Sequence, residues 1–186
     1  AWPWLRRHHR LQEGWAQRVL AEAPAGPFDV WIQAASAGES HLARQLVAAL
    51  PVPAAPRVLV TTNTRQGMEI LEAAAGRPPA EEERATTAAY CPLDRPAVMQ
   101  RALAAFAPRL LILLETEIWP ALLFHCARRR VPVLIVNGRI TRRSFRGYRR
   151  LPPLWRALAP TQVLAVSAAD AERFRGLFPA ARVSVM

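Results

Sequence analysis

Glu39 is the first residue in the sequence whose type and position could do chemistry, because its carboxylate can accept a proton from a hydroxyl group. It follows an apolar run at 30–32, which favours a β-strand, and a run of small residues at 34–38. Ser36 and Gly38 lie in the small run, where another molecule can approach the backbone closely. Ligands of open α/β sheets bind at the carboxyl ends of the strands. The segment therefore predicts a strand, a tight turn and a helix start that hold Glu39 at the mouth of a crevice.

The spacing of Ser36 and Glu39 also has a purely structural interpretation. Ser-x-x-Glu is the pattern of a capping box, in which both side chains bind free backbone N–H groups at the start of a helix. The same spacing recurs at Ser167 and Asp170. A carboxylate in this position is expected to stay ionised at neutral pH and to be a weak base. The pattern by itself favours a cap and leaves a catalytic role open.

Two further glutamates, Glu115 and Glu117, follow the continuous apolar run 110–114. Such a run is typical of a strand buried on both faces of a parallel sheet. Either side chain could instead stabilise the amino terminus of the helix that follows. Since the carboxyl ends of parallel strands meet at one edge, we expect Glu39 and at least one of Glu115 and Glu117 to line the same cleft.

Arg139 comes after the next apolar run, at 133–136, and after the pair Asn137-Gly138. Asn-Gly is a common turn sequence, which accounts for those two residues without a function. A guanidinium fixed at this edge can hold a phosphate or a carboxylate through two parallel hydrogen bonds. Arg139 is therefore a candidate for binding an anionic substrate.

The charge distribution in the second half of the chain is one-sided, with ten arginines and no acidic residue between Glu117 and Asp170. Solvated helix faces usually mix both signs, so this stretch predicts an acidic partner. Part of it interleaves cations and rings: Arg142, Arg143, Phe145, Arg146, Tyr148, Arg149 and Arg150. That combination suits an anionic membrane, with inserted rings and arginines on lipid phosphates, and it would also suit RNA.

The composition bounds the class of protein. The 186 residues are 52% apolar, enough for one domain with a proper core, and the net charge is +11. Cys91 and Cys126 are too few for a disulfide framework, and the histidines lack metal-ligand spacing, so neither a disulfide framework nor a metal site is expected. Apolar runs also fall short of the roughly 18 residues that span a bilayer. A helix is expected at 5–20, with Trp15 and Val19 on one face and arginines opposite, suited to a membrane interface or equally to packing on the domain.

Strands and helices alternate along the rest of the chain. Strands are expected at 30–32, 58–62, 87–91, 110–114, 133–136, 163–166 and 183–185. Helices are expected at 40–50, 64–75, 96–108, 118–130, 142–159 (broken at 152–153) and 168–177, with Asp94 marking the start of the third. This alternation predicts an α/β fold with a doubly wound, parallel, Rossmann-like sheet. A dinucleotide site lacks its main support, because no Gly-x-Gly-x-x-Gly follows the first strand.

Several short motifs occur in an order that resembles one known family. They are Ala35-Ser36-Ala37-Gly38-Glu39, Thr61-Thr62-Asn63-Thr64, Pro92-Leu93-Asp94, Glu115-Thr116-Glu117-Ile118-Trp119-Pro120 and Asn137-Gly138-Arg139. Together they look like the amino-terminal half of a Kdo transferase, the bacterial enzyme that adds 3-deoxy-D-manno-octulosonic acid (Kdo) to a lipid A precursor. The resemblance covers nearly the whole chain, and the string from Glu115 to Pro120 is its most specific part.

The resemblance implies one half of a two-Rossmann-domain (GT-B) glycosyltransferase. Residues 1–20 would form a membrane-proximal helix, 21–182 an acceptor-binding domain, and 183–186 the start of a link to a donor-binding domain. Glu39 would be the catalytic base of an inverting transfer. The residues implied to bind substrate are Ser36, Gly38, Glu115, Glu117 and Arg139. The donor CMP-Kdo would bind mainly to the other domain, so this fragment alone is expected to be inactive and to need no cofactor.

The implied partners are a lipid A precursor and an anionic membrane at the cytoplasmic face of the bacterial inner membrane, with no nucleic acid. Two rival interpretations stay open on the sequence. One is a non-enzymatic basic α/β module that binds RNA or another polyanion, although carboxylates at the sheet edge would repel phosphates there. The other is a GT-B glycosyltransferase with a different sugar donor.

Overall fold

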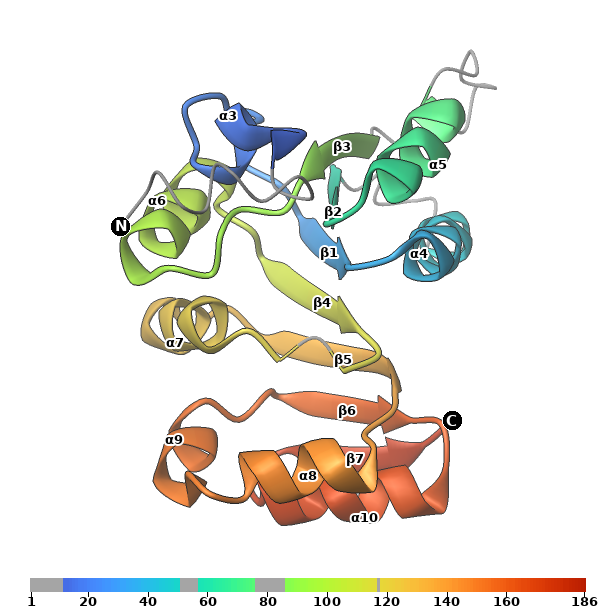
Figure 1. The fold of residues 1–186 in the computed structure, drawn as a ribbon, viewed down its shortest axis with the longest axis vertical. Helices are drawn as coiled ribbons and strands as arrows, with labels where there is room; N and C mark the ends of the chain where they lie inside the picture. The colour runs from blue at the N-terminus through green and yellow to red at the C-terminus, as the bar shows by residue number, and fades with distance from the viewer. Residues whose placement is uncertain (1–11, 51–56, 76–85, 117) are drawn as a thin grey trace.

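The computed structural model of the chain describes residues 12–50, 57–75, 86–116 and 118–186. Strands in these ranges form one seven-stranded parallel sheet in the order β3-β2-β1-β4-β5-β6-β7 (Figure 1). The strands are β1 (Val30–Ala34), β2 (Val58–Thr62), β3 (Thr86–Tyr90), β4 (Leu110–Leu114), β5 (Val133–Gly138), β6 (Gln162–Ala165) and β7 (Arg182–Val185). The predicted Rossmann-like parallel sheet is confirmed.

Helices cover both faces of this sheet. They are α3 (Trp15–Arg18), α4 (Ala37–Ala49), α5 (Arg65–Ala75), α6 (Pro96–Phe106), α7 (Pro120–Arg129), α8 (Arg142–Tyr148), α9 (Pro152–Ala157) and α10 (Ala168–Leu177). Side chains of α4 and α5 share one hydrophobic cluster with the sheet, and side chains of α6, α7, α9 and α10 share the other. The break in the predicted helix 142–159 is confirmed, because α9 begins at Pro152.

The direction of winding reverses between β1 and β4. The chain moves outward from β1 through β2 to β3 and then returns to the other side of β1, so Gln33 pairs with Thr61 of β2 and with Leu113 of β4. In open α/β sheets, ligands bind at such a switch point, beside the carboxyl ends of the two strands. The segments that leave β1 and β4 there carry Glu39 and Glu115.

Strand β1 is anchored by Trp31, whose side chain is fully buried. Its ring meets Phe106 of α6 edge to face, with centroids 5.1 Å apart, and its indole N–H donates to the Thr61 hydroxyl at 2.7 Å. A buried tryptophan with a satisfied N–H combines a large apolar contact with a fixed orientation. The strand that leads to Glu39 is therefore held by a helix, α6, and by its neighbouring strand, β2.

The amino-terminal segment differs from the predicted helix at 5–20. Residues 1–11 lie outside the described residues; Gln12 is helical, the chain then turns at Gly14 (φ 64°), and the short α3 follows. Arg18, expected to face solvent, is 2% exposed: it donates to the Asn63 carbonyl at 2.8 Å and lies 4.7 Å above the Tyr90 ring. Burial lowers the pKa of Arg18. A buried guanidinium needs partners at fixed positions, so the segment docks on the ends of β2 and β3 instead of continuing as an amphipathic helix.

Candidate functional site

Glu39 forms the capping box that its spacing predicts. The Ser36 hydroxyl donates to Glu39 Oε1 at 3.0 Å and accepts the Glu39 backbone N–H at 3.3 Å. The Ala35 backbone N–H donates to Oε2 at 2.8 Å. Each carboxylate oxygen has a second lone pair that these bonds leave available. The cap therefore fixes the carboxylate without using up its capacity to accept a proton.

Burial changes the chemistry of this carboxylate. Glu39 is only 7% exposed. Burial raises its pKa above the ordinary value for glutamate, the charge of Glu115 raises it further, and the hydrogen bonds from Ala35 and Ser36 oppose the shift. A carboxylate with a raised pKa is a stronger base than an ordinary one. The helix start alone predicted a weak base, and the sequence could not show how completely the side chain is enclosed.

Replacing Glu39 by glutamine tests this burial through the pH dependence of stability. Because the pKa of Glu39 is raised in the folded chain, its favourable contribution is complete below the unfolded pKa of about 4.3 and is lost as the pH rises through the folded-state pKa. Glutamine keeps a capping-box side chain and carries no charge. Urea unfolding should therefore show Glu39→Gln gaining stability relative to wild type between about pH 4 and pH 7. An equal stability difference at both pH values would contradict a raised pKa.

The structure brings Glu115 to the same switch point, directly after β4. Burial is the main cause of the raised pKa of Glu39, and the charge of Glu115 adds to it. Glu115 has a left-handed backbone (φ 57°), as does Asn137 on the neighbouring strand (φ 55°), and the Asn137 amide donates to Glu115 Oε1 at 3.4 Å. Non-glycine residues in this conformation are uncommon and cluster at functional sites. Glu117 lies outside the described residues.

The pair Asn137-Gly138 is not the turn that its sequence predicts. Both residues belong to β5, where the register against β6 shifts between Ile135 and Gly138. A Cβ at Gly138 would lie 3.0 Å from the Phe174 ring, so glycine permits the close approach of α10 to the strand. Arg139 follows as an exposed residue, and within the described ranges no hydrogen bond or ion pair engages its guanidinium. The side chain is free to meet an anion.

Asp94 caps α7, whereas the sequence predicts that it marks the start of α6. It does not cap α6, whose N-cap residue Arg95 makes no side-chain cap. Its carboxylate instead accepts the backbone N–H groups of Ala121 at 3.2 Å and Leu122 at 2.9 Å, at the start of α7. Burial raises the pKa of Asp94 although these two bonds lower it. Asp94 thus ties the segment after β3 to the helix that follows the Glu115 loop, a tertiary contact with no local sequence signal.

Removing this long-range cap should destabilise the chain. Asp94→Ala leaves two N–H groups of α7 without an acceptor, so we expect the free energy of unfolding to fall by about 0.5–2 kcal/mol. Asp94→Asn keeps an accepting oxygen and should cost less. Urea unfolding of both variants measures the effect, with the exposed Glu172→Ala as a control. A loss for Asp94→Ala no larger than the control's would show that the cap contributes nothing.

The arginines of α8 lie on an exposed surface. Three of them, together with Arg150 just beyond the helix and one glycine, line a groove of about 620 Å³, named here the arginine groove: Arg142, Arg143, Arg146, Gly147 and Arg150. Among the described residues, no hydrogen bond or ion pair engages these four side chains. Like charges gathered without counter-charges form an anion-binding surface. Arg149 instead lies 5.5 Å above the Phe145 ring.

The two rings expected to enter a membrane face the protein. Phe145 and Tyr148 are partly buried and pack against the main core cluster. A Cβ at Gly176 would lie 3.1 Å from the Phe145 ring, and Tyr148 meets Trp155 edge to face at 5.2 Å. Arginines and rings do occupy different helix faces, as the spacing predicts, but the rings anchor the helix. The large apolar side chains exposed nearby are Leu151 and Leu154.

Other predicted features can be placed as well. Cys91 and Cys126 are both buried, and burial raises the pKa of Cys126 to about 12. Within the described ranges, no cluster of histidine, cysteine or acidic residues is arranged to hold a metal ion. None of the helices described there combines the length and the apolar character needed to cross a membrane.

Comparison with known proteins identifies related sequences. A sequence profile of the 3-deoxy-D-manno-octulosonic-acid transferase (kdotransferase) family matches residues 7–186. The chain is 34% identical to a 3-deoxy-D-manno-octulosonic acid transferase of Bordetella pertussis, covering 78% of this chain and 35% of that protein. The enzyme of the same name from Haemophilus influenzae is 32% identical, covering 78% and 33%.

A bifunctional glycosyltransferase/methyltransferase of Fusobacterium nucleatum is 27% identical, covering 69% of this chain and 19% of that protein. The chain spans about a third of the length of the two Kdo transferases described above. Its parallel sheet is the amino-terminal Rossmann-like half of the GT-B fold. The chain belongs to the 3-deoxy-D-manno-octulosonic-acid transferase family, whose members are glycosyltransferases.

Proposed function

We propose that this chain forms the acceptor side of an enzyme that transfers Kdo from CMP-Kdo to a lipid A precursor in lipopolysaccharide biosynthesis. The observation that carries the proposal is the state of Glu39, a buried carboxylate with a raised pKa at the switch point of the sheet. This is the position where open α/β sheets bind ligands. The family is named for the transfer of Kdo, and the Glu39 carboxylate is suited to accepting the proton of a hydroxyl group.

In the proposed reaction, Glu39 accepts the proton of the acceptor's primary hydroxyl. That oxygen attacks the anomeric carbon of Kdo, a C–O bond forms, and the bond to the CMP phosphate breaks with its electron pair leaving on CMP. Attack from the face opposite CMP inverts the configuration at the anomeric carbon. Ala35 and Ser36 keep the carboxylate in one orientation throughout, which lowers the entropic cost of reaching the transition state.

The remaining site residues have proposed roles around this base. Burial keeps Glu39 basic and the charge of Glu115 adds to this effect, while Glu117 contributes to the acceptor side. Ser36 and Gly38 let the acceptor approach the backbone, and Arg139 binds an acceptor phosphate as a bidentate donor. We place the donor site in the part of the relatives' length that this chain does not span. No metal or cofactor takes part in the proposed step.

The arginine groove has a proposed role in holding the acceptor at its membrane. Guanidinium groups without counter-charges suit the phosphates of lipid A and of anionic lipids, and the exposed Leu151 and Leu154 suit the apolar side of that interface. The proposed place of action is the cytoplasmic face of the bacterial inner membrane. Carboxylates at the switch point repel nucleic-acid phosphates, which disfavours the RNA-binding alternative for that site.

Transfer of labelled sugar tests the proposed function. The full-length protein carrying this chain is incubated with labelled CMP-Kdo and a lipid A precursor, and the lipid fraction is counted. Residues 1–186 alone serve as the control and are expected to give no product.

A further inference from the structure

Helix α8 cannot hold its own conformation. It spans seven residues, none of which is buried. Isolated helices shorter than about 12 residues are marginal in water, because the cost of nucleation exceeds what a few hydrogen bonds return. Its cap, in which the Thr141 hydroxyl accepts the Ser144 backbone N–H at 3.1 Å, is local. The direction in which α8 presents its arginines must therefore come from contacts with other elements.

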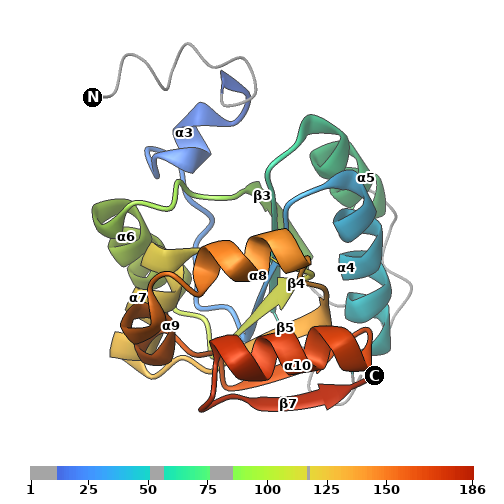
Figure 2. The ribbon, with the colours of Figure 1, turned by 60° about the horizontal axis from the view of Figure 1, so that its bottom comes forward.

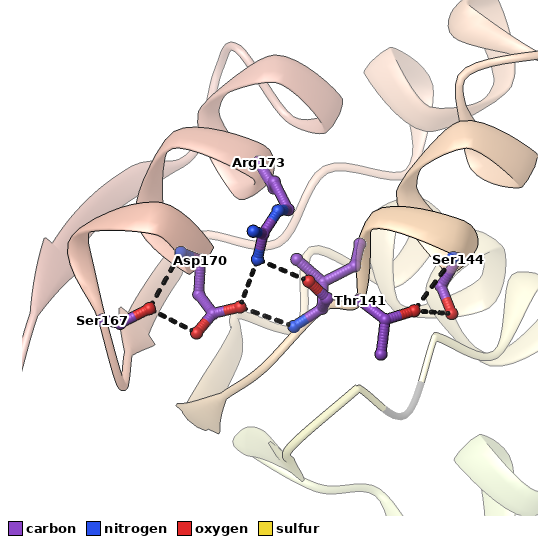
Figure 3. Close-up of polar contacts among 6 residues, drawn as sticks. Thr141, Ser144, Ser167, Asp170 and Arg173 are labelled. Atoms are coloured by element: carbon purple, nitrogen blue, oxygen red, sulfur yellow. Dashed lines mark hydrogen bonds and ion pairs between the residues drawn. The ribbon is translucent and has the colours of Figure 1, made fainter.

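One such contact is a polar hub at the start of α10 (Figure 3). The Asp170 carboxylate accepts the backbone N–H of Ile140 at 3.0 Å and the Ser167 hydroxyl at 2.6 Å. Arg173 donates to Asp170 at 3.0 Å and to the Ile140 carbonyl at 2.9 Å. Both backbone groups of Ile140 are thus held by one acid–base pair. Ile140 directly precedes Thr141, the residue that caps α8.

The ion pair of Asp170 and Arg173 is mostly shielded from solvent, and both of its side chains are charged. The side chains of Asp170 and Arg173 are 15% and 21% exposed. Burial opposes ionisation of Asp170, but the bonds from Ser167 and Ile140 together with the Arg173 charge lower the pKa of the carboxyl below its ordinary value. Hydrogen bonds that involve charged groups are roughly twice as strong as neutral ones. The pair is suited to fixing the backbone at residue 140.

A second contact completes the attachment of α8 to α10, and Figure 2 shows the two helices side by side. The Phe145 ring packs over Gly176, where a Cβ would lie only 3.1 Å from the ring, so a larger residue would press against it. With its start held by Asp170 and its inner face held at Gly176, α8 has one orientation. Its outer face then carries three side chains of the arginine groove, Arg142, Arg143 and Arg146, and Arg150 follows two residues beyond its end.

We propose that Asp170 and Arg173 are positioning residues for the arginine groove: by holding Ile140 they set the start of α8 and thereby gather its arginines into one anion-binding surface. This inference rests on the proposed function, because it assumes that the groove binds lipid phosphates. It adds to that function the claim that Asp170, although it is acidic, strengthens anion binding.

Simple electrostatics predicts the opposite sign. Removing the carboxylate of Asp170 makes the chain more positive, so charge alone predicts tighter binding to anionic vesicles. A positioning role predicts weaker binding in spite of the added charge. Glu172 offers a matched control, since it is an exposed acid two residues away on the same helix, and the structure shows no bond to its carboxylate.

The experiment compares wild type, Asp170→Ala, Asp170→Asn and Glu172→Ala in co-sedimentation with vesicles containing an anionic phospholipid, and in hydrogen exchange. Asp170→Ala should bind roughly fivefold more weakly or worse, the equivalent of losing one arginine's contribution. It should also exchange faster at residues 140–148, with β1 and β4 unchanged. Glu172→Ala should bind as tightly as wild type or tighter. Asp170→Asn keeps an oxygen for Ile140 and should restore most of the binding.

Vesicle binding and hydrogen exchange together show whether the positioning role or the proposed role of the groove is wrong. Binding by Asp170→Ala equal to or above that of Glu172→Ala would overturn the positioning role. Unchanged exchange at residues 140–148 would overturn it as well. If wild type does not bind anionic vesicles, the proposed role of the groove is wrong, while exchange still decides whether the pair holds α8. If Asp170→Ala does not fold, Arg173→Gln replaces it, because it removes the guanidinium that bonds both Asp170 and the Ile140 carbonyl; exchange at residues 140–148 identical to wild type would then count against the proposal.

Discussion

Glu39→Gln in the full-length protein should slow transfer of Kdo by about 10²-fold or more while leaving the fold intact. Glutamine is close in shape to glutamate and can serve a capping box, so the start of α4 should be preserved. It cannot accept the proton of an attacking hydroxyl. The loss should appear in the rate constant for transfer more than in the affinity for the acceptor, since the proton moves in the transition state.

The control for this result is Glu172→Gln, which removes an exposed carboxylate from α10 and should leave transfer unchanged. Far-UV circular dichroism and urea unfolding measure folding in the same samples. A variant at Glu39 with normal specific activity and reduced stability would show that the residue is a helix cap and nothing more.

The second large effect is expected for the arginine groove. Replacing Arg142, Arg143, Arg146 and Arg150 together by glutamine should weaken binding to anionic vesicles by roughly 10²- to 10³-fold, since each arginine near such a surface contributes on the order of 1 kcal/mol. Wild-type binding should also fall as salt rises, because ions screen charges separated by more than roughly 10 Å. Co-sedimentation with anionic and neutral vesicles measures both effects.

A control with the same change in net charge separates a site from general attraction. It replaces four exposed arginines that lie outside the groove: Arg44, Arg109, Arg128 and Arg182. Binding should then fall far less than in the groove variant. Equal losses in the two variants, or equal pelleting of wild type with neutral vesicles, would contradict a localised site. Tighter binding to structured RNA than to anionic vesicles would favour the nucleic-acid alternative.

The fold could be predicted because its signals are local. The apolar run at β4 and the alternation of strands and helices identify a parallel sheet without knowledge of distant contacts. The caps at Ser36 and Ser167 were equally predictable, since the donor and acceptor lie three residues apart. These features need only the order of residues in a short window.

The errors come from contacts between residues far apart in the sequence. Asp94 caps a helix that begins some 26 residues later, and Arg18 finds its acceptor at Asn63, so short-range patterns assign both to the wrong surroundings. Phe145 has the spacing of an exposed ring, but its contact with Gly176 turns it inward. The raised pKa of Glu39 has the same origin, because burial and the charge of Glu115 both depend on the packed sheet.

The most direct test of the account is transfer of labelled Kdo from CMP-Kdo to a lipid A precursor by the full-length protein, with and without Glu39. Wild type should give labelled lipid with inverted configuration at the anomeric carbon, and Glu39→Gln should lose nearly all of this product. Labelled lipid formed equally well by the Glu39→Gln protein would contradict it. So would the absence of product with CMP-Kdo when another nucleotide sugar is accepted.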